Sequence, residues 1–246
     1  MKKLFIVFLA LAVGLTFTVS ADAKKKKKKK SKYKVMEVTN GGSIAGKAIF
    51  AGANPPKDGV KPLTSEKELC GESVPAEEYI INGNKEIKNV VVYLDGIKKG
   101  KAIPKGNSLV DNVLCYFVPH VSVGFKGNKI DIVNSDPVFH NVHSYIKGKT
   151  TYNLGLPDQG SKVTKKMKRD GVMEVKCDSH PWMLGYVFIS KHPYAVATNE
   201  AGDFSITDIP AGSYKVKAWH EGFGKIDLGK ITVEAGKTAK VNAEFK

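Results

Sequence analysis

The stretch that decides the fold spans residues 175–186 and reads Val175-Lys176-Cys177-Asp178-Ser179-His180-Pro181-Trp182-Met183-Leu184-Gly185-Tyr186. It places a thiol, an imidazole and a thioether within seven residues, at Cys177, His180 and Met183. Upstream, the segment His140-Asn141-Val142-His143 can supply a second imidazole. One thiolate, one thioether and two imidazoles form a soft donor set that suits a single copper ion.

Strand periodicity decides which of these side chains can meet, because alternate residues of a strand face opposite sides. In a strand over 172–177, Cys177 lies on the face of the alternate apolar residues and points into a core. In a strand over 138–144, His140 and His143 fall on opposite faces. His140 shares its face with valines and is the expected fourth ligand. His143 is expected at the surface or beside the ligands, unless a bulge turns it inward.

Both segments resemble those of the cupredoxins, and of the amicyanin-like members in particular. The resemblance lies in Cys-x-x-His-Pro-x-Met-x-Gly-x-Val at 177–187 and in His-Asn-Val-His at 140–143. It implies one type 1 copper ion, held by His140, Cys177, His180 and Met183.

Neighbouring residues are expected to tune this site. Asn141 or a backbone N–H can donate to the sulfur. Pro181 and Trp182 can form an apolar rim through which electrons leave the imidazole of His180, although a core-filling role for Trp182 is equally open. Zinc would favour more thiolates and has no use for a thioether.

The C-terminal run 197–216 resembles the carboxypeptidase regulatory-like, transthyretin-like β-sandwich. The opening segments typical of that family appear far upstream, at 42–50 and 90–96. This resemblance implies a discontinuous sandwich formed by 41–102 and 192–246. A copper domain at 103–191 would be inserted in one of its loops. Such an insertion is tolerated because the entropic cost of closing a loop grows only slowly with its length. The alternative is two domains that follow one another along the chain.

Short alternating runs separated by Gly, Pro, Asn and Asp recur along the chain and predict an all-β protein. The expected fold is a cupredoxin Greek-key β-sandwich, inserted in or adjacent to a transthyretin-like β-sandwich. One short helix is expected at 65–69. The expected strands are 43–50, 90–94, 121–125, 129–133, 138–144, 172–177, 185–189, 203–206, 214–220, 229–233 and 239–245.

The N-terminal residues indicate export. Residues 1–23 have the pattern of a secretory signal, with two lysines, an apolar stretch and a cleavage site after Ala23, which implies a periplasmic or secreted protein. An uncleaved anchor is less favoured, because the apolar stretch 4–19 is shorter than the roughly 20 residues of a spanning helix.

The charge of the chain is concentrated in one segment. The formal net charge is +15, and nine lysines lie between residues 24 and 34. Residues 24–40 are expected to form a disordered tail. Its lysines, Lys24–Lys30, suit an anionic membrane surface or an acidic partner, or serve as a solubilising linker. Nucleic acid is not an expected partner, because the body of the chain lacks a basic and aromatic patch.

Three cysteines in an oxidising compartment leave one unpaired if two form a bridge. Cys70 and Cys115 lie in segments without other soft ligands, so a disulfide between them is expected and leaves Cys177 for the metal. His120, close to Cys115, is not assigned to a site. His192 and His220 are expected to be solvent-facing or core residues.

The motifs favour an electron carrier rather than an enzyme. No nucleophilic triad, phosphate-binding loop or carboxylate pair at a recognisable spacing is evident. The expected partners are redox proteins, such as a cytochrome or a dehydrogenase. The alternative is an extracytoplasmic module that stores copper or binds carbohydrate or protein.

Overall fold

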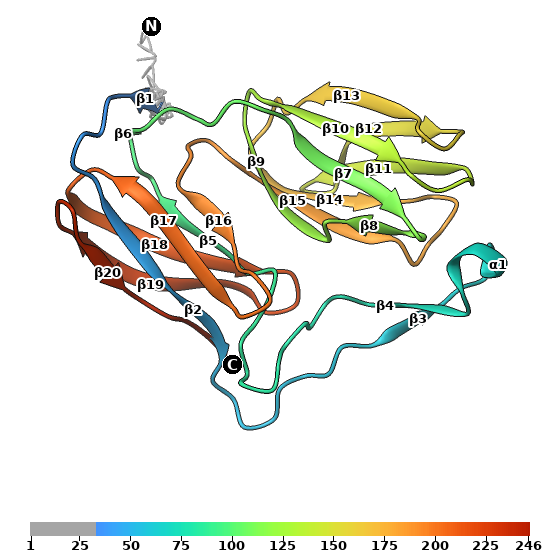
Figure 1. Ribbon diagram of the computed structural model, residues 1–246, viewed down its shortest axis with the longest axis horizontal. Coiled ribbons are helices and arrows are strands. Elements are labelled where there is room, and N and C mark those ends of the chain that lie inside the picture. The colour runs from blue at the N-terminus through green and yellow to red at the C-terminus, as the bar shows by residue number, and fades with distance from the viewer. Residues whose placement is uncertain (1–32) are drawn as a thin grey trace, which may run out of the picture. The chain divides into compact units, whose positions relative to one another are not determined.

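The computed structural model describes residues 33–246, and nearly all of their regular structure is β-strand (Figure 1). The expected all-β fold class is therefore confirmed. The single helix among these residues, α1, is one turn at Lys67–Cys70, close to the expected 65–69. The predicted signal segment, 1–23, and residues 24–32 of the predicted disordered tail lie outside the described residues. The expectation of disorder up to residue 40 is wrong, because Lys34–Val35 form a short strand that pairs with Lys99–Gly100.

The middle of the chain forms two packed sheets (Figure 1). One has the order β13-β10-β7-β8 and the other β12-β11-β14-β15-β9. Buried side chains from both sheets share one hydrophobic core, which is the arrangement of a β-sandwich. Its strands are β7 (Ser108–Val113), β8 (Tyr116–Val118), β9 (Val121–Phe125), β10 (Lys129–Asn134), β11 (His140–Ile146), β12 (Lys149–Leu156), β13 (Lys162–Lys166), β14 (Gly171–Lys176) and β15 (Leu184–Ser190).

Strands from both ends of the described chain form a second pair of sheets. Their orders are β16-β5-β18-β19 and β17-β2-β20, with β21 also paired to β2, and they enclose a second core. The predicted domain boundaries remain a prediction. The strands are β2 (Gly42–Phe50), β5 (Val91–Asp95), β16 (Ala195–Ala197), β17 (Asp203–Ile209), β18 (Gly212–His220), β19 (Gly224–Val233), β20 (Thr238–Lys240) and β21 (Ala243–Phe245).

The strand expected at 239–245 is in fact two short strands, which is a correction. Both β20 and β21 run parallel to β2, on either side of Gly46. A Cβ at Gly46 would lie 1.8 Å from the carbonyl oxygen of Val241, so only a glycine at position 46 leaves room for the backbone of Val241. The close approach interrupts the strand.

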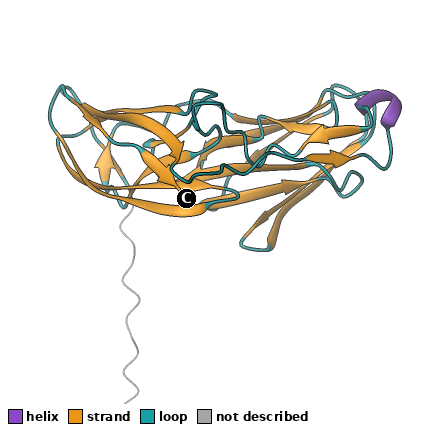
Figure 2. Ribbon diagram, turned by 90° about the horizontal axis from the view of Figure 1, so that it is seen from below, coloured by secondary structure: helices purple, strands orange, loops and turns teal. Residues whose placement is uncertain are grey.

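Residues 59–76 form a separate hairpin, called the arm below (Figure 1, Figure 2). It consists of β3 (Val60–Pro62), α1 and β4 (Ser73–Pro75), and β3 pairs antiparallel with β4. Leu63 and Val74 bury their side chains in the core of the middle sheets. A further two-stranded pairing joins β1 (Lys34–Val35) to β6 (Lys99–Gly100).

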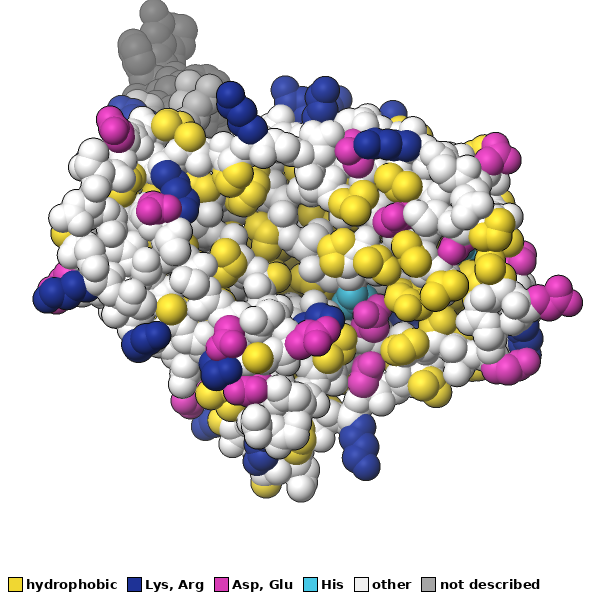
Figure 3. Space-filling model, viewed as in Figure 1, with side chains coloured by type: hydrophobic (Ala, Val, Ile, Leu, Met, Phe, Trp, Pro, Cys, Tyr) yellow, Lys and Arg dark blue, Asp and Glu magenta, His cyan; other side chains and the backbone are white. Residues whose placement is uncertain are grey.

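Among residues 33–246, no helix is long and apolar enough to cross a membrane. On the face drawn in Figure 3, apolar side chains gather over the region of β7 and β8. The exposed Leu109 and Val118 belong to these strands, and the exposed Leu114 lies in the turn between them.

Candidate metal centre

The ends of two neighbouring strands position the predicted ligands. β11 and β14 pair antiparallel, with His143 opposite Lys176. His140 therefore starts β11 beside the point where Cys177 follows β14. The expected alternation in β14 holds, since Met173, Val175 and Cys177 are buried while Lys176 is exposed. β11 begins at residue 140 rather than the expected 138, because residues 136–138 form a bend.

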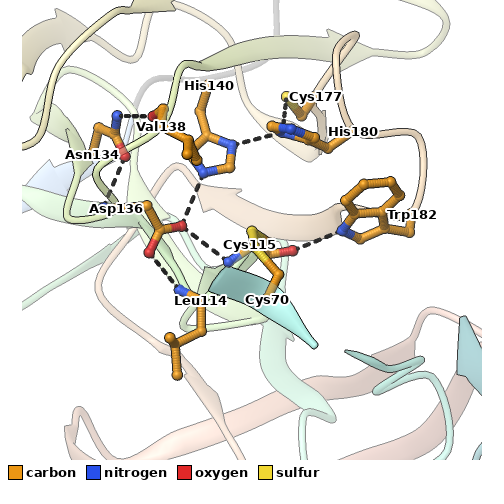
Figure 4. Close-up of a disulfide and its surroundings, with 10 residues drawn as sticks. All are labelled: Cys70, Leu114, Cys115, Asn134, Asp136, Val138, His140, Cys177, His180 and Trp182. Carbon is orange, nitrogen blue, oxygen red and sulfur yellow. Dashed lines mark hydrogen bonds and ion pairs between the residues drawn. A yellow bond between two sulfur atoms is a disulfide. The ribbon is translucent and has the colours of Figure 1, made fainter. Parts of the chain in front are cut away.

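Three of the four predicted ligand side chains converge in a buried cluster (Figure 4). The Nδ1 atom of His180 lies 2.9 Å from Nδ1 of His140 and 3.6 Å from Sγ of Cys177. All three candidate ligand atoms lie within 4.8 Å of one another. Donors bound to one first-row metal ion, at about 2.0–2.3 Å each, are at most about 4.4 Å apart. Both measured distances satisfy this limit.

Met183 lies in the same loop as Cys177 and His180, residues 177–183, which is called the ligand loop below. It also belongs to the same core. Its side chain is buried in the cluster that contains Cys177 and Trp182. Its backbone N–H donates to the carbonyl of His180 at 2.9 Å, so the loop folds back on itself between these two residues. The thioether is thus held on the ligand loop without access to solvent.

Asn141 links the strand of His140 to the ligand loop. Its backbone N–H donates to Sγ of Cys177 at 3.4 Å, and its Oδ1 lies 3.3 Å from the same sulfur. That Oδ1 also accepts from the backbone N–H groups of Asp178, at 2.7 Å, and of Ser179. The loop around the sulfur is therefore fixed by one amide side chain.

Electrostatics favour the neutral form of each candidate ligand in the absence of metal. Burial raises the pKa of the Cys177 thiol, and nearby backbone N–H groups oppose this shift. Burial likewise lowers the pKa of both His140 and His180. Neutral imidazoles are ready to bind a metal, whereas the thiol must give up its proton when a metal binds.

Asp136 is a residue of the candidate site that the motifs did not reveal. Its Oδ2 lies 2.9 Å from Nε2 of His140. A proton on Nε2 donates to this carboxylate and leaves the lone pair of Nδ1 directed toward His180. The carboxylate also accepts from the backbone N–H groups of Leu114, at 2.6 Å, and Cys115, at 3.0 Å. An acidic residue four positions before a candidate histidine was the only available signal.

Other residues expected near the site have distinct positions. Trp182 is a core residue, and its Nε1 donates to the carbonyl of Cys115 at 3.0 Å. Its ring lies 5.1 Å from that of His180, whereas Pro181 is exposed. His143 faces away from the cluster and contacts Asp178 at 3.0 Å. The register shift in β11 lies after Ser144, so no bulge turns His143 inward.

The expected disulfide between Cys70 and Cys115 is confirmed, and Cys177 is the free cysteine. His120 lies outside the ligand cluster, in a buried ion pair with Glu221. His192 and His220 are both buried, which agrees with the core alternative.

Comparisons with known proteins give one family match and several structural likenesses. Residues 187–246 match the family model described as the carboxypeptidase regulatory-like domain. No curated protein matches the chain.

Solved cupredoxin structures cover about a third of the chain. A purple cupredoxin from Nitrosopumilus maritimus is 22% identical over 34% of this chain and 100% of its own, with a TM-score of 0.31. A reduced amicyanin variant is 20% identical over 36% of this chain and 86% of its own, also with a TM-score of 0.31.

A copper-containing nitrite reductase from Thermus scotoductus is 21% identical over 37% of this chain, with a TM-score of 0.31. The match covers only 24% of the reductase. The predicted resemblance to the carboxypeptidase regulatory-like domain is confirmed for the C-terminal part of the chain, residues 187–246.

Proposed function

We propose that this protein is an electron carrier with one type 1 copper ion. The ligands would be His140, Cys177, His180 and Met183. The observation that supports this most directly is the convergence of two imidazole Nδ1 atoms and one thiol sulfur in a buried cluster. A thiolate with two imidazoles and a weak thioether is the ligand set of electron-transfer copper sites.

Bound copper would supply a one-electron couple between Cu(II) and Cu(I). The residues of the chain would keep the donor atoms in place in both oxidation states. Asp136 holds the ring of His140, and Asn141 holds the sulfur and the loop that follows it. A site fixed by such contacts changes little when an electron enters or leaves, which favours transfer over catalysis.

The visible spectrum of the copper-loaded protein tests this proposal. An intense sulfur-to-copper band is expected for the wild-type chain. The Cys177→Ser variant keeps the size of the side chain but removes the thiolate, so the band should vanish. Wild-type protein loaded with Cu(II) that lacks this band would refute the proposal.

Electrochemistry separates an electron carrier from a copper store. A reversible one-electron couple with fast self-exchange is expected for the carrier. Cu(I) that cannot be reoxidised would instead support storage.

We further propose that the protein works outside the cytoplasm. The disulfide Cys70–Cys115 suits an oxidising compartment, as does the signal-like pattern of residues 1–23. Redox proteins such as a cytochrome or a dehydrogenase are the proposed partners. Lys24–Lys30 are proposed to bind an anionic membrane surface or an acidic partner. Cosedimentation with anionic vesicles, with and without residues 24–30, tests the membrane part.

A further inference from the structure

The arm, residues 59–76, leaves one pair of sheets and packs on the other. Its two ends meet, since the N–H of Ala76 donates to the carbonyl of Gly59 at 2.8 Å. Between them, Leu63 and Val74 are buried in the core that also contains Trp182. The arm is thus a hairpin that starts and ends at the same place and packs on the sandwich that carries the candidate ligands.

Two contacts place the arm against the ligand loop and against the turn between β7 and β8. Nζ of Lys61 donates to the carbonyl of Trp182 at 3.3 Å. The disulfide joins Cys70 at the end of α1 to Cys115, whose carbonyl accepts from the indole of Trp182 (Figure 4).

The candidate ligands have almost no contact with solvent. The exposed fractions are 0% for His140, 2% for Cys177, 3% for His180 and 1% for Met183. A site that exchanges electrons by direct contact with small molecules needs an accessible ligand edge. Here a segment from outside the sandwich of β7–β15 contacts the loop that carries three of the four candidate ligands.

We propose that the arm is a cover for the metal centre, and that the Cys70–Cys115 disulfide anchors it. The cover restricts the access of small molecules, such as chelators, oxidants and alkylating reagents, to Cys177 and its neighbours. The metal in this proposal rests on the proposed function above, whereas the covering of Cys177 by the arm does not.

The arm is built to move separately from the sheets. Its side chains in the core are the buried Leu63 and Val74 and the partly buried Leu69 and Cys70, and its helix is a single turn. Segments with few buried contacts open locally at a lower free energy than the whole fold requires. The disulfide restrains that opening, because it ties α1 to the turn between β7 and β8.

Alkylation of the metal-free protein by iodoacetamide tests the cover without copper. The chain has three cysteines and two form the disulfide, so Cys177 is the one thiol that reacts. In the double variant Cys70→Ser/Cys115→Ser, Cys177 should react at least tenfold faster than in the wild-type protein. A second variant, in which an Asn-Gly turn replaces residues 60–75 and Cys115 is serine, should react at least as fast.

Two controls separate opening of the arm from general destabilisation. Lys67→Ala removes an exposed ion pair with Glu72 inside the arm and should leave the alkylation rate unchanged. Amide hydrogen exchange should keep its wild-type protection in β14 and β15 of both arm variants. An unchanged alkylation rate in either variant would overturn the proposal. So would faster alkylation with an equal loss of protection in β14 and β15.

Removal of Cu(I) by bicinchoninate gives a second readout in the loaded protein. The same two variants should lose copper at least tenfold faster than the wild-type chain. If the chain binds no copper, the function proposed above fails, while the alkylation rates still decide whether the arm covers Cys177.

Discussion

Asp136→Asn should weaken both the fold and the metal centre, because the carboxylate joins His140 to the turn between β7 and β8. That turn consists of Leu114 and Cys115, whose φ angles are 48° and 63°. Positive φ at both central residues is normally the role of Asn or Gly. Here the two N–H groups of the turn are held by the oxygens of Asp136 instead.

The expected cost follows from the contacts that asparagine cannot keep. The carboxylate accepts from three donors, at 2.6, 2.9 and 3.0 Å. An amide keeps one oxygen and turns an NH₂ group toward the remaining donors. Each hydrogen bond to a charged group contributes about 1.5–3 kcal/mol. We therefore expect a loss of about 3 kcal/mol in the free energy of unfolding of the metal-free protein.

Urea denaturation of the metal-free variant measures this loss. The copper affinity should also fall by about ten- to a hundredfold, because the tautomer of His140 is no longer fixed. Asp203→Asn is a matched control on an exposed ion pair with Lys47, and it should change neither quantity. If Asp136→Asn costs less than about 1 kcal/mol, the role assigned to the carboxylate is wrong.

Three further predictions concern the rest of the molecule. Burial, together with the charge of His120, lowers the pKa of His220 to about 4, so the unfolded chain takes up a proton near pH 6.5 that the folded chain refuses. The free energy of unfolding should therefore fall by about 2 kcal/mol between about pH 7.5 and pH 5 because of this residue. In His220→Gln, the fall in the free energy of unfolding over the same pH range, measured by urea denaturation, should be smaller by that amount. Glu221→Ala removes the carboxylate paired with Nε2 of the buried His120 and should cost about 3 kcal/mol. Glu200→Ala, in an exposed pair with Lys88, should leave the unfolding midpoint unchanged. Gly46→Ala puts a Cβ 1.8 Å from a backbone oxygen and should cost more than about 2 kcal/mol, while Gly83→Ala, with no atom within 4 Å, should be neutral in the same thermal melt.

The side chains that converge could be predicted from the sequence, because their positions follow from spacing and strand parity. His140 and Cys177 lie at the ends of two paired strands, so the alternation of faces alone placed both toward one core. The disulfide followed from the environment of each cysteine. Such local rules apply wherever the two faces of a strand differ in polarity.

The residues that hold those side chains could not be predicted. Asp136 acts through the backbone of Leu114 and Cys115, in a turn without the residues typical of hairpin turns. β12 and β13 were missed because both are largely exposed and rich in polar residues, so their apolar alternation is weak. The arm has no periodicity, and its place depends on packing between segments far apart in the chain.

Variants of Cys115 and Asp136 allow the proposed metal centre and the proposed cover to be tested independently, because the backbone and the side chain of Cys115 make different contacts. The backbone N–H donates to Asp136 and the carbonyl accepts from Trp182, whereas the sulfur bonds to Cys70. The Cys70→Ser/Cys115→Ser variant keeps both backbone contacts and releases the arm. It should therefore raise the alkylation rate of Cys177 and leave the spectrum of the copper site unchanged.

Asp136→Asn keeps the disulfide, so it should lower copper affinity without the tenfold gain in alkylation that release of the arm produces. Parallel changes of both properties in both variants would show that cover and metal centre are a single unit.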